Sequence, residues 1–215
     1  EMSSALLNVL LENGSYQVCG LVTKASSKFN SDFYPLGPML EGTGTPVHYY
    51  TGDNTAMVDW ALRQEPEVIF CFGWSHILPD NLLTYPRYKT FGFHPALLPL
   101  NRGRHPLVWA LVLGLHETGS TFFIMYPGVD DGPIVSQKVI PITDHDDATS
   151  LYSKVSVSAQ AQFRQLLQEI HQDNLTLCPQ DHKRSSEWRK RTAKDGVIDW
   201  RMSARSIYNL TRALT

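Results

Sequence analysis

A histidine at the end of an apolar run is the first residue of this chain that could carry chemistry. Residues 91–93 (Phe-Gly-Phe) are typical of the end of a buried strand, and they deliver His94 into a segment broken by prolines and glycine up to residue 106. Because a histidine side chain exchanges its proton near neutral pH, His94 is the best single candidate for proton transfer. A histidine beside a strand end can also be purely structural, so its neighbours must decide between the two roles.

The neighbours of His94 favour binding of an anion. Arg102 and Arg104 flank Gly103, and His105 follows. Guanidinium groups suit phosphate or carboxylate groups, so these four residues are predicted to bind an anionic part of a substrate, although the same composition fits a solvated loop.

Two motifs together resemble a known family. The first is His-Pro-x-Leu-Leu-Pro followed by Arg-Gly-Arg-x-Pro (residues 94–106), and the second is an Asp-x-Gly loop before a strand (residues 130–132). In this order they resemble the folate-dependent formyltransferases, which include methionyl-tRNA formyltransferase, glycinamide ribonucleotide transformylase and the sugar N-formyltransferases. The resemblance implies an enzyme that moves the formyl group of 10-formyltetrahydrofolate to an amine, without a metal.

The resemblance also implies roles for individual residues. His94 would stabilise the tetrahedral intermediate or relay protons, and Asp130 would orient His94. The folate would lie against the two loops that carry the residues predicted to bind it: Gly73, Trp74, Ile77, Leu78, Val129 and Asp131. A tryptophan at a strand end can equally belong to the core.

One position departs from the family pattern. The family has an asparagine two residues before the histidine, where its amide binds the formyl oxygen, and this chain has Gly92. Loss of such a donor commonly lowers the rate by about two to three orders of magnitude. Asn101, on the following loop, is predicted as a substitute catalytic amide. The alternative is a catalytically silent module that binds folate or a nucleotide.

Residues 102–109 look most like those of the sugar N-formyltransferases, which predicts a nucleotide-linked amino-dideoxy sugar as the substrate and a role in bacterial surface glycan or nonulosonic acid synthesis. Hydrolysis of 10-formyltetrahydrofolate, or formylation of tRNA or glycinamide ribonucleotide, stays open. The formal charge of −2 gives no general attraction to nucleic acid or to an anionic membrane.

Composition is typical of a globular protein, with 42% hydrophobic and 19% charged residues in 215. Three scattered cysteines form no metal-binding pattern and fit reduced thiols, and no apolar run approaches membrane-spanning length, so a cytoplasmic protein is expected. Homodimerisation is plausible by resemblance. His145 lies among carboxylates, but adjacent side chains there would point apart, so no metal site is expected.

The periodicity predicts an α/β, Rossmann-like domain with a mostly parallel central sheet flanked by helices. Helices are expected near 2–13, 53–64, 80–84, 106–113, 148–171 and 203–214, strands near 16–22, 67–72, 91–93, 118–125 and 134–141, and a mobile loop at 24–45. Residues 1–172 would form the formyltransferase core, apparently without its first strand. Residues 173–215 would form a C-terminal segment packed on that core; its basic cluster, residues 183–191, either is solvated or binds substrate phosphate.

Overall fold

The computed structural model describes residues 1–27 and 33–215, so residues 28–32 of the predicted mobile loop lie outside the described residues. The α-helices in this part of the chain are α1 (Met2–Leu11), α2 (Asn54–Arg63), α3 (Asp80–Thr84), α4 (Pro106–Val112), α5 (Ala148–His171) and α6 (Ala204–Arg212). The strands are β1 (Leu21–Thr23), β2 (Val47–Tyr49), β3 (Ile69–Cys71), β4 (Thr90–His94), β5 (Arg102–Gly103), β6 (Glu117–Ile124), β7 (Ile134–Pro141) and β8 (Glu187–Trp188).

The central sheet has the strand order β3-β4-β6-β7. β3 and β4 are parallel, whereas β4–β6 and β6–β7 are antiparallel. The α/β class is confirmed, and this sheet is more mixed than the predicted mostly parallel one. For β6 and β7 the reason is local, because the 125–133 loop joins them directly, and a short connection between neighbouring strands reverses the chain direction. β1 and β2 form a separate parallel pair.

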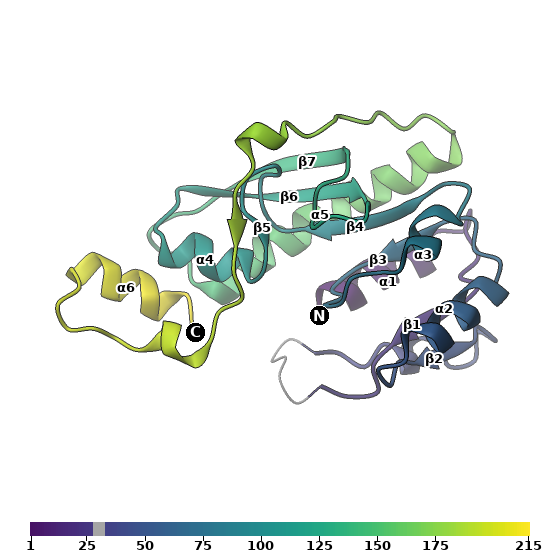
Figure 1. The fold of residues 1–215 in the computed structure, drawn as a ribbon, viewed down its shortest axis with the longest axis horizontal. Helices are drawn as coiled ribbons and strands as arrows, with labels where there is room; N and C mark the ends of the chain where they lie inside the picture. Colours follow the sequence, from purple (N-terminus) through teal and green to yellow (C-terminus); the bar gives the residue numbers. More distant parts are fainter. Residues whose placement is uncertain (28–32) are drawn as a thin grey trace.

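The pleat of β4 decides which side chains reach the site. Alternation along the strand places Phe91 in the core cluster that contains Phe122 and Phe163, so Gly92 and His94 face the opposite side of the sheet. Phe163 lies on α5, and its ring stacks on that of Phe122 at 5.8 Å between centroids. The sheet therefore has one face covered by α1 and α5, and another face that presents His94 (Figure 1).

Helix starts follow the capping rules. The Asp53 side chain accepts the backbone N–H of Ala56 at α2, and the Ser203 side chain accepts that of Ser206 at α6. At α5, Asp147 and Ser150 form a reciprocal capping box. Asp53, Asp147 and Ser203 are therefore the N-caps of these three helices.

The segment between α5 and α6, residues 173–203, is here called the strap. It runs back along the molecule from the end of α5 to α6, which lies beside α4 (Figure 1). The backbone of Cys178 exchanges two hydrogen bonds of 2.8 Å with Ile134, and β8 pairs in parallel with β5. At the end of α6, Ala213 joins the core cluster of Ala110. These contacts fit the predicted packing of residues 173–215, while the division into two units stays a prediction.

A cavity of about 240 Å³ lies between the β1–β2 pair and the central sheet. Val22 of β1 and Phe70 of β3 line it from either side, and Leu6 of α1 lines it as well. His94 is not part of its lining, so this cavity lies away from the predicted catalytic residue. No helix in the described part of the chain has the length and apolar character needed to span a membrane.

Candidate active site

His94 is held between the two loops that the sequence singled out. Its side chain is buried at the end of β4, with Nε2 2.7 Å from the backbone oxygen of Asn101 and Nδ1 3.5 Å from Oδ2 of Asp130. A carbonyl oxygen can only accept a hydrogen bond, so Nε2 carries a proton in this arrangement. A second proton, taken up at Nδ1, would point toward the Asp130 carboxylate. The geometry therefore suits a histidine that carries protons beside a negative charge.

Asp130 connects the second loop to the first. Its Oδ2 accepts the backbone N–H of Gly103 at 2.9 Å, and its backbone has a left-handed φ of +48°. A left-handed conformation costs about 1–2 kcal/mol for a residue with a side chain, so the surroundings must hold it. The structure thus brings together His94, Asn101 and Asp130, the three residues predicted to be catalytic, although their roles stay predictions.

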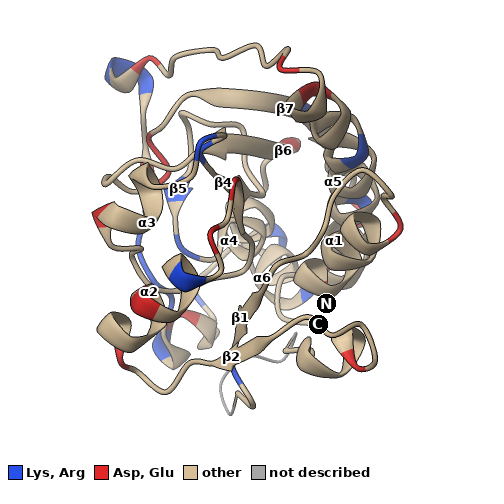
Figure 2. Ribbon diagram, turned by 90° about the vertical axis from the view of Figure 1, so that its right-hand side faces the viewer, with Lys and Arg blue, Asp and Glu red and all other residues tan. Residues whose placement is uncertain are grey.

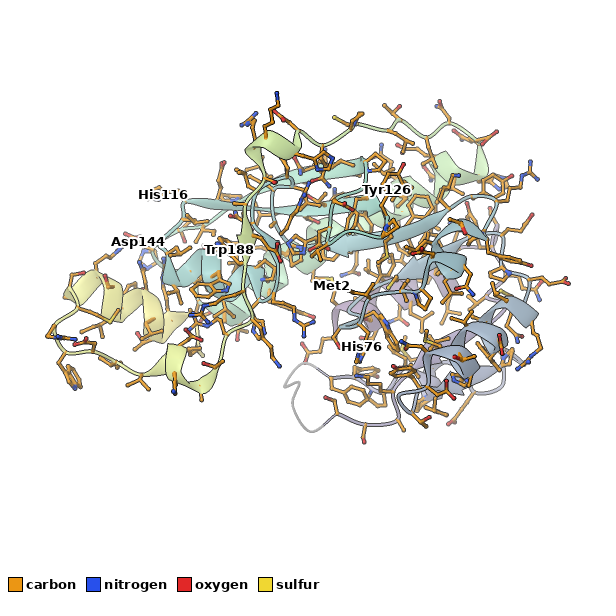
Figure 3. The ribbon with its side chains drawn as sticks, in the orientation of Figure 1. Met2, His76, His116, Tyr126, Asp144 and Trp188 are labelled. Carbon is orange, nitrogen blue, oxygen red and sulfur yellow. The ribbon has the colours of Figure 1, made fainter. Side chains whose placement is uncertain are left out.

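Gly103 has a structural reason to be glycine. Its φ is +94°, and a Cβ added there would lie 2.4 Å from the backbone oxygen of Trp188 on β8. Trp188 lies on the strap near α4 (Figure 3), with its ring 6.4 Å from that of Trp109. The close pairing of β5 with β8 explains this glycine and leaves its N–H pointing at Asp130.

The two arginines beside Gly103 point to different partners. Arg102 donates through Nη2 to Oε1 of Gln180 at 2.6 Å, and the same nitrogen lies 3.2 Å from Nδ1 of His182. Arg104 is exposed and donates to the backbone oxygen of Ser75 at 2.9 Å. Arg102 is therefore engaged with the strap, and Arg104 is the more accessible of the two.

Positive charge gathers around Arg104 despite the overall acidic balance. Burial, together with the charges of Arg104, Arg191 and Lys190, lowers the pKa of His105. Burial and the charges of Lys24 and Arg104 likewise lower the pKa of His76. Basic positions on and after β5 lie beside β4 in Figure 2. This side of the molecule is suited to an anionic ligand.

The place of the family's asparagine is filled by other side chains. A Cβ at Gly92 would lie 2.7 Å from Cζ of Phe123 and 3.0 Å from Cγ of Met125. Phe123 is buried on the adjacent strand, opposite Gly92 in the register. An amide at position 92 therefore has no room unless Phe123 moves.

Asn101 stands close to His94 and is fixed by the strap. Its φ is +62°, its N–H donates to Oγ of Ser186 at 2.9 Å, and its Oδ1 accepts from the same hydroxyl at 3.3 Å. Among the described residues, nothing accepts a hydrogen bond from its side-chain NH₂. The side-chain amide of Asn101 is thus oriented through its oxygen, and its NH₂ group can donate a hydrogen bond to a ligand.

The loops predicted to bind folate carry buried polar atoms without partners. Nε1 of Trp74 and Oδ1 of Asp131 are buried and make no hydrogen bond within the described residues. Ile77 and Val129, on the same two loops, are 72% and 46% exposed. A flat heterocycle with donors and acceptors would satisfy both polar atoms and cover the apolar side chains, and that these residues bind folate stays a prediction.

Two of the other residues predicted to bind folate have packing roles. Leu78 is buried in the core cluster of Met57 and Leu82. Gly73 has a φ of +66°, and a Cβ added there would lie 2.7 Å from Oγ of Ser3 in α1. His76 lies on the segment after β3 (Figure 3), and its ring is 5.6 Å from that of Trp74.

The residues that sequence reasoning missed lie on the strap. Gln180 contacts both motif loops and Ser186 contacts the first, but both occur in a polar stretch without periodicity, which gives no signal. Within the described residues, no three His, Cys, Asp or Glu side chains form a group that could hold a metal.

Comparison with known proteins gives the family. The formyl transferase family model matches residues 46–167, which is more than half of the chain. The chain belongs to the formyl transferase family. It is therefore an enzyme that transfers formyl groups.

Solved structures of similar fold extend the comparison. WlaRD, a sugar 3N-formyl transferase crystallised with dTDP and 5-N-formyl-THF, has a TM-score of 0.75 and 19% identity over 99% of this chain and 75% of its own. An N-formyltransferase from Helicobacter canadensis, in complex with folinic acid and dTDP-3-aminofucose, has a TM-score of 0.76 and 19% identity over 99% and 77%. A 4-N formyltransferase from Francisella tularensis has a TM-score of 0.78 and 17% identity over 100% and 83%. At these identities the likeness establishes the fold.

Proposed function

We propose that this formyl transferase moves the formyl group of 10-formyltetrahydrofolate to the amine of a nucleotide-linked amino-dideoxy sugar. The observation that carries the proposal is the His94–Asp130 pair, which joins the two family motifs in one site beside a basic face. The ligands bound in WlaRD and in the Helicobacter canadensis enzyme, folates with dTDP or a dTDP-sugar, point the same way. Such a product suits bacterial surface glycan or nonulosonic acid synthesis in the cytoplasm.

The folate would be held by the loops after β3 and β6. It supplies the formyl group and leaves with one more proton than it brought. Trp74 would donate through Nε1 and Asp131 would accept through Oδ1, because both atoms are buried without partners. Ile77 and Val129 would cover an apolar face of the ring and exclude water.

His94 would carry out the proton transfer. An attacking amine must lose a proton, and negative charge develops on the formyl oxygen. His94 Nε2 already carries a proton, through which it donates a hydrogen bond to the Asn101 carbonyl in the resting arrangement. A bound substrate that takes the place of this carbonyl would receive that hydrogen bond, while Asp130 balances the charge on the ring. The side-chain NH₂ of Asn101, on the same loop, would supply the second donor.

The sugar nucleotide would place its diphosphate on the basic face. Arg104 and Lys190 are exposed, and both contribute to the positive field around His105. A diphosphate carries the complementary charge and accepts hydrogen bonds from guanidinium groups. This arrangement suits a small anionic substrate without requiring a strongly basic protein.

The experiment is turnover of 10-formyltetrahydrofolate with a panel of nucleotide-linked 3-amino and 4-amino dideoxy sugars. We expect loss of the formyl group that depends on one sugar, with a formamido sugar detected by mass spectrometry. His94→Ala should lower the rate by about 10²–10⁴-fold. His171→Ala, at the exposed end of α5, is the matched control and should retain it.

Other outcomes separate the alternatives. Consumption of folate without any amino sugar would indicate hydrolysis, and formylation of tRNA or glycinamide ribonucleotide would identify a different substrate. Tight folate binding with no turnover under any condition would refute the proposal and favour a silent binding module. A His94→Ala variant with the wild-type rate would refute the assigned role of the histidine.

A further inference from the structure

We propose that Gln180, on the strap, is a positioning residue that holds the two catalytic loops in register. The proposal rests on the formyl transfer proposed above, because its effect is exerted through Asp130. Gln180 is buried, with 7% of its surface exposed, and its side chain lies where the two motif loops meet.

The amide of Gln180 is fully used. Its Oε1 accepts from Nη2 of Arg102 at 2.6 Å, and its Nε2 donates to the backbone oxygens of Asp130 at 2.9 Å and Gly132 at 2.7 Å. The side chain of Gln180 therefore binds the first motif through the guanidinium group of Arg102 and the second motif through the backbone carbonyls of Asp130 and Gly132. Buried amides in general satisfy their hydrogen-bonding groups, but here all the partners belong to catalytic loops.

These hydrogen bonds stabilise the backbone conformation of Asp130, which sets the position of its carboxylate beside His94. The left-handed φ of Asp130 must be imposed by the surroundings, and the loop around it contains no regular secondary structure. Gln180 holds the carbonyl of Asp130 itself, while the Gly103 N–H holds its carboxylate. Because Gln180 also binds Arg102, which directly precedes Gly103, the contacts close a ring around the Asp130 carboxylate.

The strap is a firm base for this side chain. Two residues before Gln180, Cys178 exchanges two backbone hydrogen bonds with Ile134 of β7. Beyond it, the Ser186 carbonyl accepts the N–H of Arg102 at 2.9 Å, and β8 pairs with β5. The backbone on both sides of Gln180 is thus held by hydrogen bonds, so its side chain has a fixed position from which to hold the two loops.

The test must separate positioning from general stability. Gln180→Met keeps the size of the side chain and removes every hydrogen bond of its amide. Gln162→Met is the matched control, since Gln162 is also buried and donates to the Ser120 carbonyl and the Ser136 hydroxyl, away from both loops. Both variants should lose similar thermal stability. Only Gln180→Met should lower kcat, by about 10- to 100-fold, with KM for 10-formyltetrahydrofolate changed by less than about 3-fold.

A double-mutant cycle shows whether the effect passes through Asp130. If Gln180 acts by placing the carboxylate, Gln180→Met should add less than about 2-fold to the loss already caused by Asp130→Asn. Gln180→Glu keeps the acceptor for Arg102 and removes both N–H donors, so it should reproduce the kcat loss even where Gln180→Met fails to fold.

A readout without turnover keeps this proposal distinct from the proposed function. The ring ¹⁵N chemical shifts of His94, measured by NMR on the folded proteins, should move in Gln180→Met toward those of Asp130→Asn and stay unchanged in Gln162→Met. If the wild type consumes no folate, the proposed function fails, while the NMR comparison still tests the positioning. Unchanged His94 shifts in folded Gln180→Met, or kcat equal to that of Gln162→Met, would overturn the inference.

Discussion

Restoring the family's asparagine at position 92 should damage this protein. In β4, a Cβ at this position would lie 2.7 Å from Cζ and 2.9 Å from Cε1 of Phe123, closer than carbon atoms normally approach. Phe123 has 3% of its surface exposed, so its ring has little free space into which it could move. The added side chain therefore overpacks the interface between β4 and β6.

The expected loss follows from three contributions. Overpacking of a core costs about 1–3 kcal/mol. A buried amide without a partner adds about 1–3 kcal/mol. Removal of a glycine from a strand returns about 0.5–1 kcal/mol. Gly92→Asn should thus lower the free energy of unfolding by about 3 kcal/mol, or the melting temperature by roughly 6–12 °C in a chain of this size.

Thermal unfolding and folate turnover, measured on the same samples, check this expectation. Gly92→Ala adds the Cβ alone and should show a smaller loss. Gly14→Ala is the matched control, because nothing lies within 4 Å of the added Cβ, and it should stay within about 0.5 kcal/mol of the wild type. In a Phe123→Ala background, Gly92→Asn should cost at least about 1 kcal/mol less. A Gly92→Asn variant as stable as the wild type would refute the argument that Phe123 occupies this space.

Two further predictions concern Asn101 and Asp146. Asn101→Gly removes the side-chain amide but tolerates the left-handed backbone, so turnover should fall by about 10²–10³-fold with little change in melting temperature; an unchanged rate would show that the amide is idle. Burial opposes the charge of Asp146, but hydrogen bonds from Lys154 and Thr143 outweigh it and hold its pKa at about 2. Because this folded-state pKa is depressed, its stabilisation is complete above about pH 4 and is lost as the pH falls toward about 2. Asp146→Asn should therefore cost roughly 2 kcal/mol at pH 7 in chemical denaturation, and the difference from wild type should shrink toward zero as the pH falls through about 2; a difference independent of pH would contradict this.

Local signals in the sequence predicted most of the elements and singled out His94 as a candidate. The bounds predicted for α5 and β7 agree with the structure, because an acidic cap, a long amphipathic pattern and a proline mark them. His94 was identifiable because the strand end and the prolines after it are local features. β1 was predicted too early, at residue 16, because pairing begins only where β2 lies opposite Leu21. Strand pairing depends on a distant segment and leaves no local mark.

The strap could not be predicted for the same physical reason. Gln180 and Ser186 act on residues 48 to 85 positions away, and their polar neighbours show no periodicity that would indicate burial. The packing role of Leu78 was also hidden, since an apolar residue on a loop fits a ligand pocket and a core equally well. Such assignments require the three-dimensional contacts.

The glycine at position 92 and the strap are parts of one arrangement. With Phe123 in the place of a strand-borne amide, the proposed amide donor near His94 comes from the loop after the strand, where the Asn101 carbonyl already contacts the ring. A loop offers less order than a strand, so an amide on it needs external support to be preorganised for catalysis. Ser186 gives that support to Asn101, and Gln180 gives it to Asp130. If Asn101 supplies the donor as proposed, activity depends on a segment outside both family motifs, and a sequence comparison restricted to those motifs would overlook Gln180 and Ser186.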